Sequence, residues 1–177
     1  QTVDTELFKE VGLSNPATIS RERILENVCR VQEGNDIPKS ANLLEDYLTK
    51  AEAEDPKTTV YSFPNFSVEM ETGTGKTYVY LRTIFDLNAK YGFKKFIIVV
   101  PSVAIREGVL KSIEITKDHF GAIFNNVPFD YFVYDSKKLG KVRQFATSNQ
   151  IQVMVINVQA FLRDEGDASN IIHQERD

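Results

Sequence analysis

A run of small, hydroxylated and basic residues at positions 72 to 77 has the composition of a phosphate-binding loop. It reads Thr72-Gly73-Thr74-Gly75-Lys76-Thr77. Glycines let successive backbone N–H groups point at one centre, and a following helix offers its unpaired N-terminal N–H groups to phosphate oxygens. In such a loop, Lys76 is the catalytic cation on the β and γ phosphates, and Thr77 is a ligand of Mg²⁺. We therefore predict that these six residues bind the phosphates of a nucleotide.

The match to the pattern G-x-x-x-x-G-K-[ST] has one departure, because Met70 occupies the position of the first glycine. Phe66, Val68 and Met70 alternate with polar residues, which predicts a short strand before the loop. The alternative is a glycine-rich turn between a strand and a helix that binds nothing. Lys-Thr directly after Gly-x-Gly, in this context, favours nucleotide binding.

Segments with helical and strand periodicity alternate after this loop. We expect helices at residues 76–90, 103–120 and 138–148, and strands at residues 96–100, 131–134 and 151–156. The strand at residues 96–100 is almost entirely apolar, which predicts burial on both faces of a parallel sheet. The alternation predicts an α/β fold of the P-loop type, with right-handed β-α-β units and a mostly parallel sheet.

The N-terminal part has a different pattern. Helices are expected from about Ile19 to Gly34 and again after Pro38, where four apolar side chains fall on one face: Leu44, Tyr47, Leu48 and Ala51. Residues 52–59 are polar and broken by a proline, which is typical of an exposed loop. We predict a helical N-terminal segment with this loop at residues 1–60, and an incomplete α/β lobe at residues 61–177.

Composition and charge limit the possible settings and partners. The 177 residues are 42% hydrophobic, and no apolar run approaches the ~20 residues that cross a bilayer. Cys29 is the only cysteine, so a disulfide framework is excluded and we expect a cytoplasmic protein without membrane contact. Residues 76–163 carry thirteen Lys/Arg and six Asp/Glu, whereas both flanking segments are acidic. A basic face for a polyanion and an ordinary fluctuation of charge both fit this distribution.

Two stretches, Phe66 to Ile84 and Tyr91 to Gly108, resemble the Res subunit of type III restriction endonucleases, a superfamily 2 helicase-like translocase. The form Met-Glu-Thr-Gly-Thr-Gly-Lys-Thr is characteristic of that family, so Met70 departs only from the general pattern. The resemblance implies the first RecA-like lobe of an ATP-driven DNA motor, truncated before its Asp-Glu motif. It also implies double-stranded DNA and a methyltransferase (Mod) subunit as partners. Because the chain opens on Gln1, we expect a piece of a longer protein.

The same resemblance implies residues that contact nucleic acid. Pro101, Ser102 and Arg106 fall where superfamily 2 proteins place a segment on the nucleic-acid backbone. Asn157 and Gln159 fall near another segment of this kind. A strand end followed by a helix N-terminus suits this role, since it offers N–H groups to phosphates without reading bases. The alternative for Arg106 is a solvated helix face.

Acidic residues for hydrolysis are harder to place. A P-loop needs a partner strand that ends in Asp-Glu, and no apolar strand here does so. We interpret Asp135 as a loop acid, and we reject a nuclease centre at Asp130 and Asp135 because only four residues separate them. Gln32 is interpreted as a solvated helix terminus, which leaves adenine recognition unassigned. A kinase-like phosphotransferase and a nucleotide-switch binding module remain alternatives to the DNA motor.

Overall fold

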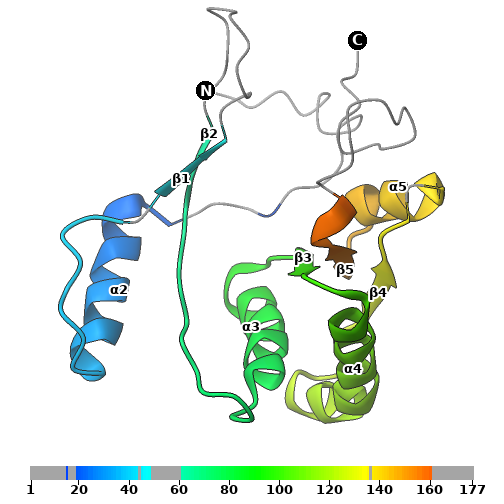
Figure 1. The fold of residues 1–177 in the computed structure, drawn as a ribbon, viewed down its shortest axis with the longest axis horizontal. Coiled ribbons are helices and arrows are strands. Elements are labelled where there is room, and N and C mark those ends of the chain that lie inside the picture. The colour runs from blue at the N-terminus through cyan, green and yellow to red at the C-terminus, as the bar shows by residue number, and fades with distance from the viewer. Residues whose placement is uncertain (1–14, 16–18, 44, 49–60, 136, 161–177) are drawn as a thin grey trace, which may run out of the picture. The chain divides into compact units, whose positions relative to one another are not determined.

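The computed structural model describes residues 15, 19–43, 45–48, 61–135 and 137–160 (Figure 1). The chain divides into two compact units. One unit comprises Gln1–Pro16 and Thr72–Asp177, and the other comprises Ala17–Glu71. The division falls between Glu71 and Thr72, so the whole glycine-rich run lies in the first unit.

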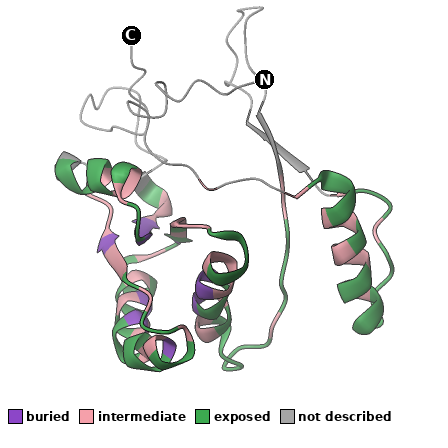
Figure 2. Ribbon diagram, turned by 180° about the vertical axis from the view of Figure 1, so that it is seen from behind, coloured by how far each residue is buried: buried purple, intermediate pink, exposed green. Residues whose placement is uncertain are grey.

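The smaller unit contains one helix and a two-stranded sheet. Helix α2 (Arg21–Gly34) confirms the first predicted helix and begins at Ser20, whose Oγ accepts a hydrogen bond from the Arg23 N–H at 3.3 Å. Its residues are exposed or half-buried, as Figure 2 shows. Strands β1 (Glu45–Leu48) and β2 (Tyr61–Pro64) pair antiparallel.

The helix predicted after Pro38 is wrong at residues 45–48, which form strand β1. Apolar residues at positions 44, 47, 48 and 51 suit a helix, but the segment instead gains backbone hydrogen bonds from β2, with Glu45 opposite Pro64. Such a partner lies far along the chain and is invisible to local periodicity. Residues 44 and 49–60, including Ala51 and the predicted polar loop, lie outside the described residues.

The larger unit contains a three-stranded parallel sheet in the order β3-β5-β4. Its strands are β3 (Lys95–Val100), β4 (Phe129–Val133) and β5 (Ile151–Asn157), and a 3₁₀ turn follows at Val158–Ala160. Its helices are α3 (Lys76–Tyr91), α4 (Val103–Ile123) and α5 (Leu139–Thr147). These elements confirm the predicted alternation and the parallel sheet.

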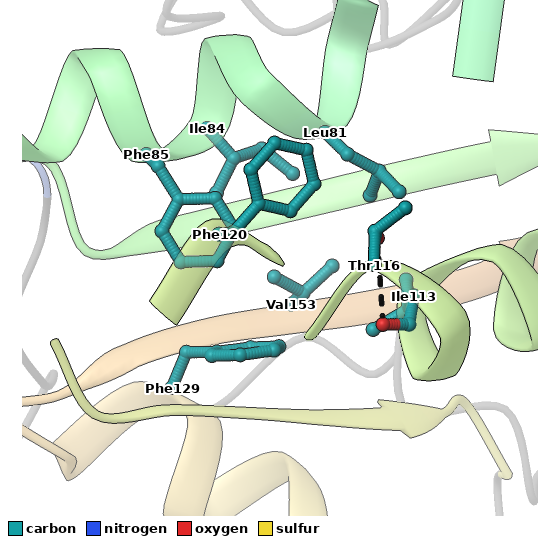
Figure 3. A pocket seen from close by; sticks show the side chains of 8 residues that line it. All are labelled: Leu81, Ile84, Phe85, Ile113, Thr116, Phe120, Phe129 and Val153. Carbon is teal, nitrogen blue, oxygen red and sulfur yellow. Dashed lines mark hydrogen bonds between the residues drawn. The ribbon is translucent and has the colours of Figure 1, made fainter. Parts of the chain in front are cut away.

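Helices cover the two faces of this sheet unequally. On one face, α3 and α4 pack against alternate residues of β5, namely Ile151, Val153 and Val155. Figure 3 shows the side chains of both helices converging on Phe129 of β4 and Val153 of β5. On the other face, Phe145 of α5 meets Phe132 of β4 with a ring-centroid distance of 6.1 Å. The unit therefore has three layers, with helices on both sides of the sheet.

Aromatic rings join the two helices of the larger core. Phe120 of α4 is 1% exposed, and its ring centroid lies 5.1 Å from that of Phe85 and 5.3 Å from that of Tyr78, both on α3. The gap between these helices has a volume of about 10 Å³ and an apolar lining (Figure 3). A volume of this size accommodates at most one water molecule, so it is a packing gap rather than a ligand site.

Two expectations for strands are corrected. Residues 66–70 are irregular rather than a strand, and Phe66 and Val68 are 56% and 76% exposed. Alternating apolar residues form a strand only where a neighbouring strand supplies hydrogen bonds. Strand β3 is not buried on both faces, because Ile97 and Val99 are 53% and 51% exposed. The third layer covers β5 and β4 but leaves these two side chains of β3 accessible.

The first strand of the sheet is held at its start by a distant residue. The side chain of Asn15 accepts hydrogen bonds from the Lys94 and Lys95 N–H groups at 2.7 and 2.9 Å, and donates one to the Lys95 carbonyl at 2.7 Å. Backbone groups at the outer edge of a sheet otherwise lack partners. Within the described ranges, none of the helices is long and apolar enough to cross a membrane.

Replacing Phe120 tests the packing that joins α3 to α4. Phe120→Ala should lower the free energy of unfolding by about 3–5 kcal/mol, because the lost ring leaves a cavity that the core cannot refill. Urea denaturation would measure this change. Ile115→Ala is the matched control, since Ile115 lies on the same helix and is 68% exposed; its effect should stay within about 0.5 kcal/mol. Equal effects of the two substitutions would contradict the packing described.

Candidate nucleotide-binding site

Two glycines give the predicted phosphate loop its shape. Gly73 and Gly75 have φ angles of 84° and 90°, a left-handed region that costs other L-residues about 1–2 kcal/mol. No atom lies within 4 Å of a Cβ built on either glycine, apart from atoms of the glycine itself and its chain neighbours. The backbone is therefore accessible at both positions, as close approach of a phosphate requires.

Helix α3 begins directly after this loop, at Lys76. Gly75 is its N-cap and has no side chain to accept from the N–H groups of the first turn, and the helical hydrogen bonds start with the Val79 N–H to the Gly75 carbonyl at 3.1 Å. The N–H groups at the start of any helix lack acceptors within the helix and carry its positive dipole end. An anion in front of Gly75 would accept hydrogen bonds from these N–H groups and would interact favourably with the helix dipole.

The two side chains that follow the loop differ in exposure. Lys76 is exposed, and no carboxylate pairs with it within the part of the chain that the structure describes. Thr77 is half-buried. Burial raises the pKa of Tyr80, and a hydrogen bond with the Thr77 side chain opposes that rise. The Tyr80 phenol therefore lies beside the proposed magnesium ligand, which helical i to i+3 spacing could have indicated from the sequence.

The first turn of α3 lies beside the C-terminal part of α4. The Tyr78 hydroxyl contacts the His119 ring at 2.8 Å, and the Tyr78 ring centroid lies 5.3 Å from that of Phe120. Lys76, two residues before Tyr78, is therefore close to the end of α4 that lies opposite its N-cap, Ser102.

The residues predicted to contact nucleic acid gather at the carboxyl edge of the sheet, where ligands of open parallel sheets bind. Asn157 is the parallel-register neighbour of Val100, at the ends of β5 and β3. The Gln159 side chain donates a hydrogen bond to the Pro101 carbonyl at 3.0 Å. The two segments, 58 residues apart in the sequence, therefore meet. The Asn157 Oδ1 atom is buried and has no hydrogen-bond partner among the described residues.

Ser102 and Arg106 have local partners at this edge. Ser102 is the N-cap of α4, and its Oγ accepts a hydrogen bond from the Ile105 N–H at 3.3 Å. The Arg106 guanidinium donates to the Glu107 carboxylate at 2.8 and 3.1 Å. The side chain of Arg106 is 25% exposed, against 61% for Glu107. Arg106 therefore reaches solvent with part of its charge offset by its neighbour.

Two acidic residues considered for catalysis in the sequence, Asp135 and Asp130, make local hydrogen bonds. Asp135 accepts a hydrogen bond from the Lys137 N–H at 3.0 Å, in the loop that follows β4. Asp130 lies in β4 and accepts from the Tyr131 N–H at 2.9 Å. In the described residues, no group of three His, Cys, Asp or Glu side chains could hold a metal ion.

Gln32 is more constrained than a solvated helix terminus. Its side chain donates to the Ser40 hydroxyl at 2.8 Å and accepts from the Ser40 N–H at 2.9 Å. Both polar atoms of the amide are thus engaged in closing the loop after α2.

These features define an α/β domain of the P-loop, RecA-like class, with a glycine-rich loop that opens a helix against a parallel sheet. The comparison with known families assigns it further. The family described as "Type III restriction enzyme, res subunit" matches residues 35–177. The chain belongs to this family.

Individual relatives agree with this assignment. The chain is 37% identical over 133 residues to the EcoPI Res subunit of Escherichia phage P1. The aligned region covers 73% of this chain and 12% of that protein. It is 48% identical over 77 residues to the EcoP15I Res subunit of Escherichia coli, covering 42% of this chain and 8% of that protein. It is 37% identical over 112 residues to the StyLTI Res subunit of Salmonella typhimurium, and the aligned region covers 54% of this chain and 11% of that protein. The chain thus spans about a tenth of the length of these relatives.

The left-handed glycine before α3 gives a direct test of the loop. Gly75→Ala should destabilise the loop by about 1–2 kcal/mol through its backbone alone, and should weaken binding of a fluorescent ATP analogue. Gly140→Ala is the control, because Gly140 lies in α5 without a positive φ angle and also has open space at its Cβ. The control should be neutral or stabilising by roughly 0.5–1 kcal/mol. Equal nucleotide affinity in both variants would argue against the loop as the site.

Proposed function

We propose that this chain holds ATP for a superfamily 2 DNA motor of a type III restriction enzyme. Thr72 to Thr77 wrap the triphosphate, and Lys76 neutralises its β and γ groups. The observation that carries the proposal is the pair of left-handed glycines immediately before the first residue of α3. Left-handed glycines before a helix N-terminus are the backbone arrangement that phosphate-binding loops use, which supports the assignment.

Magnesium is assigned to Thr77 in the same proposal. A Mg²⁺ ion held there would offset the negative charge of the phosphates. The Thr77 hydroxyl is an oxygen ligand of the kind Mg²⁺ takes. Its place in the first turn of α3, next to Lys76, supports the assignment. The neighbouring Tyr80 phenol restricts how that hydroxyl turns.

We propose that the motor moves on double-stranded DNA and has a methyltransferase subunit as its partner, because the relatives are Res subunits of restriction-modification enzymes. The contact between Gln159 and Pro101 supports the DNA assignment, since it joins both predicted DNA segments at one edge. Backbone contacts there would hold DNA without reading its sequence. Residues 61–177 would form the first lobe of the motor, with residues 1–60 as its N-terminal segment.

Removing the loop lysine tests the nucleotide assignment. In the full-length protein, Lys76→Ala should weaken ATP binding about 10–100-fold, because a charge-assisted hydrogen bond to phosphate is worth about 1.5–3 kcal/mol. DNA-stimulated ATP hydrolysis should fall with it, and calorimetry and phosphate release would measure the two effects. Lys90→Ala, at the other end of α3, should change neither.

The outcomes separate the proposal from its alternatives. Unchanged hydrolysis in Lys76→Ala would contradict the motor and favour a module that only holds nucleotide. Stimulation of the wild-type protein by a small acceptor molecule, and not by DNA, would favour a kinase-like phosphotransferase.

The ion pair at the start of α4 provides a test of DNA contact. Arg106→Ala should weaken binding to duplex DNA and make the slope of log Kobs against log salt shallower by about 0.9, the value for one phosphate contact. Glu107→Gln should have the opposite effect on affinity, because it removes the carboxylate that now pairs with Arg106 at 2.8 Å. Fluorescence anisotropy at several salt concentrations would measure both. If both substitutions shifted affinity in the same direction, Arg106 would not be the contact.

A further inference from the structure

Three exposed lysines lie where the chain leaves β4 and enters α5: Lys137, Lys138 and Lys141. We call them the basic turn. The sequence of α5, LGKVRQFAT, contains no acidic residue. The other helices of this unit carry acids beside their bases, in these pairs: Arg82 and Lys90 with Asp86, Arg106 with Glu107, and Lys111 with Glu114. The basic turn is therefore unlike the ordinary mixed-charge surface of the unit.

Within the described residues, the acid that contacts this turn, Asp135, does not neutralise its charge. Asp135 accepts a hydrogen bond from the Lys137 N–H at 3.0 Å, which is the largest cause of its lowered pKa. Its other carboxylate oxygen lies 3.5 Å from the Lys138 ammonium. Asp135 thus shapes the turn and pairs with Lys138, while the charge of Lys137 also contributes to its lowered pKa, so one carboxylate faces three lysines. Lys137 and Lys141 have no ion pair within the described ranges of the chain.

Strand order places the basic turn beside the proposed DNA segments. Because β5 lies between β3 and β4, the carboxyl ends of the three strands adjoin. The hydrogen bond from the Tyr134 N–H to the Val155 carbonyl, 2.9 Å, keeps the exit of β4 beside β5. At the other end of α5, the Ser148 hydroxyl accepts a hydrogen bond from the Gln152 side chain at 3.3 Å, near the amino end of β5. Helix α5 therefore starts at the carboxyl edge, and so does the basic turn.

The spacing suits one nucleic-acid backbone. Two strand separations of roughly 4.8 Å set the exits of β3 and β4 about 10 Å apart. Phosphates of one DNA strand rise about 3.4 Å per nucleotide along the axis, so about three of them span this interval. A backbone held at Pro101 and Arg106 could therefore continue across Gln159 to the basic turn.

We infer that the basic turn is a further phosphate-contacting site, which binds the backbone of the nucleic acid held by the Arg106 segment. This inference rests on the proposed function. Lysine ammonium groups act as point charges on phosphate and read no base edges. The basic turn therefore adds affinity that depends on salt but not on DNA sequence.

Salt dependence of DNA binding tests the inference in the full-length protein. For Lys137→Ala/Lys141→Ala, the slope of log Kobs against log salt should be shallower than for the wild type by about 1.8, or about 0.9 for each lost phosphate contact. The probe is a fluorescent duplex of arbitrary sequence, measured by anisotropy. ATP binding and the unfolding temperature should be unchanged.

A matched control removes the same charge elsewhere. Lys90→Ala/Lys117→Ala alters two exposed lysines on α3 and α4 that lie toward the far ends of those helices. Its slope should equal that of the wild type. If the two double variants gave the same slope while Arg106→Ala gave a shallower one, the inference would be overturned and the proposed function kept. Absence of DNA binding by the wild-type protein would overturn both. Lys141→Glu provides a second variant, which should weaken binding more than Lys141→Ala.

Discussion

Packing between α3 and α4 is the constraint on which the candidate site depends. The residues of the loop at Thr72 to Gly75 are exposed, and its glycines have open space for a Cβ. The helix that it opens is the packed element beside it. Phe120 fixes that helix through ring contacts with Tyr78 and Phe85, and the Tyr78 hydroxyl bonds to the His119 ring at 2.8 Å. Rigid docking behind a freely accessible loop is the arrangement expected of a pre-organised anion site.

Parallel strand order is the second constraint. Sequential strands β3, β4 and β5 are not sequential in space, because the last strand inserts between the first two. The insertion buries residues 151–156 of β5 completely. It also brings the 3₁₀ turn after β5 against Pro101, through Gln159. Residues separated by dozens of positions in the sequence therefore share one edge of the sheet.

The sequence predicted elements best where local pattern and packing agree. Helix α3 and strand β5 were predicted to within a residue, because each buries the apolar face or run that its sequence displays. The predictions for residues 45–48 and 66–70 were wrong for a common reason. A short apolar pattern does not determine the secondary structure until the partner strand is known. The loop residues 72–77 were recognisable because glycine and lysine at fixed spacing describe chemistry directly. The hydrogen bond between Gln159 and Pro101 could not be recognised from the sequence, because it depends on the order of the strands in the sheet.

Helix α4 gives the two proposed sites a common frame. Its N-cap, Ser102, and its first turn carry the residues assigned to DNA, whereas Phe120 near its other end packs on the first half of α3. Well-packed helices move as rigid elements rather than deforming continuously. Under the proposed function, a displacement of α3 on phosphate binding would be passed to α4 through Phe120 and His119 and would reach Arg106 along the same helix. The contacts that would carry it are those of Tyr78 and Phe85 with Phe120, which are aromatic, together with the hydrogen bond between Tyr78 and His119.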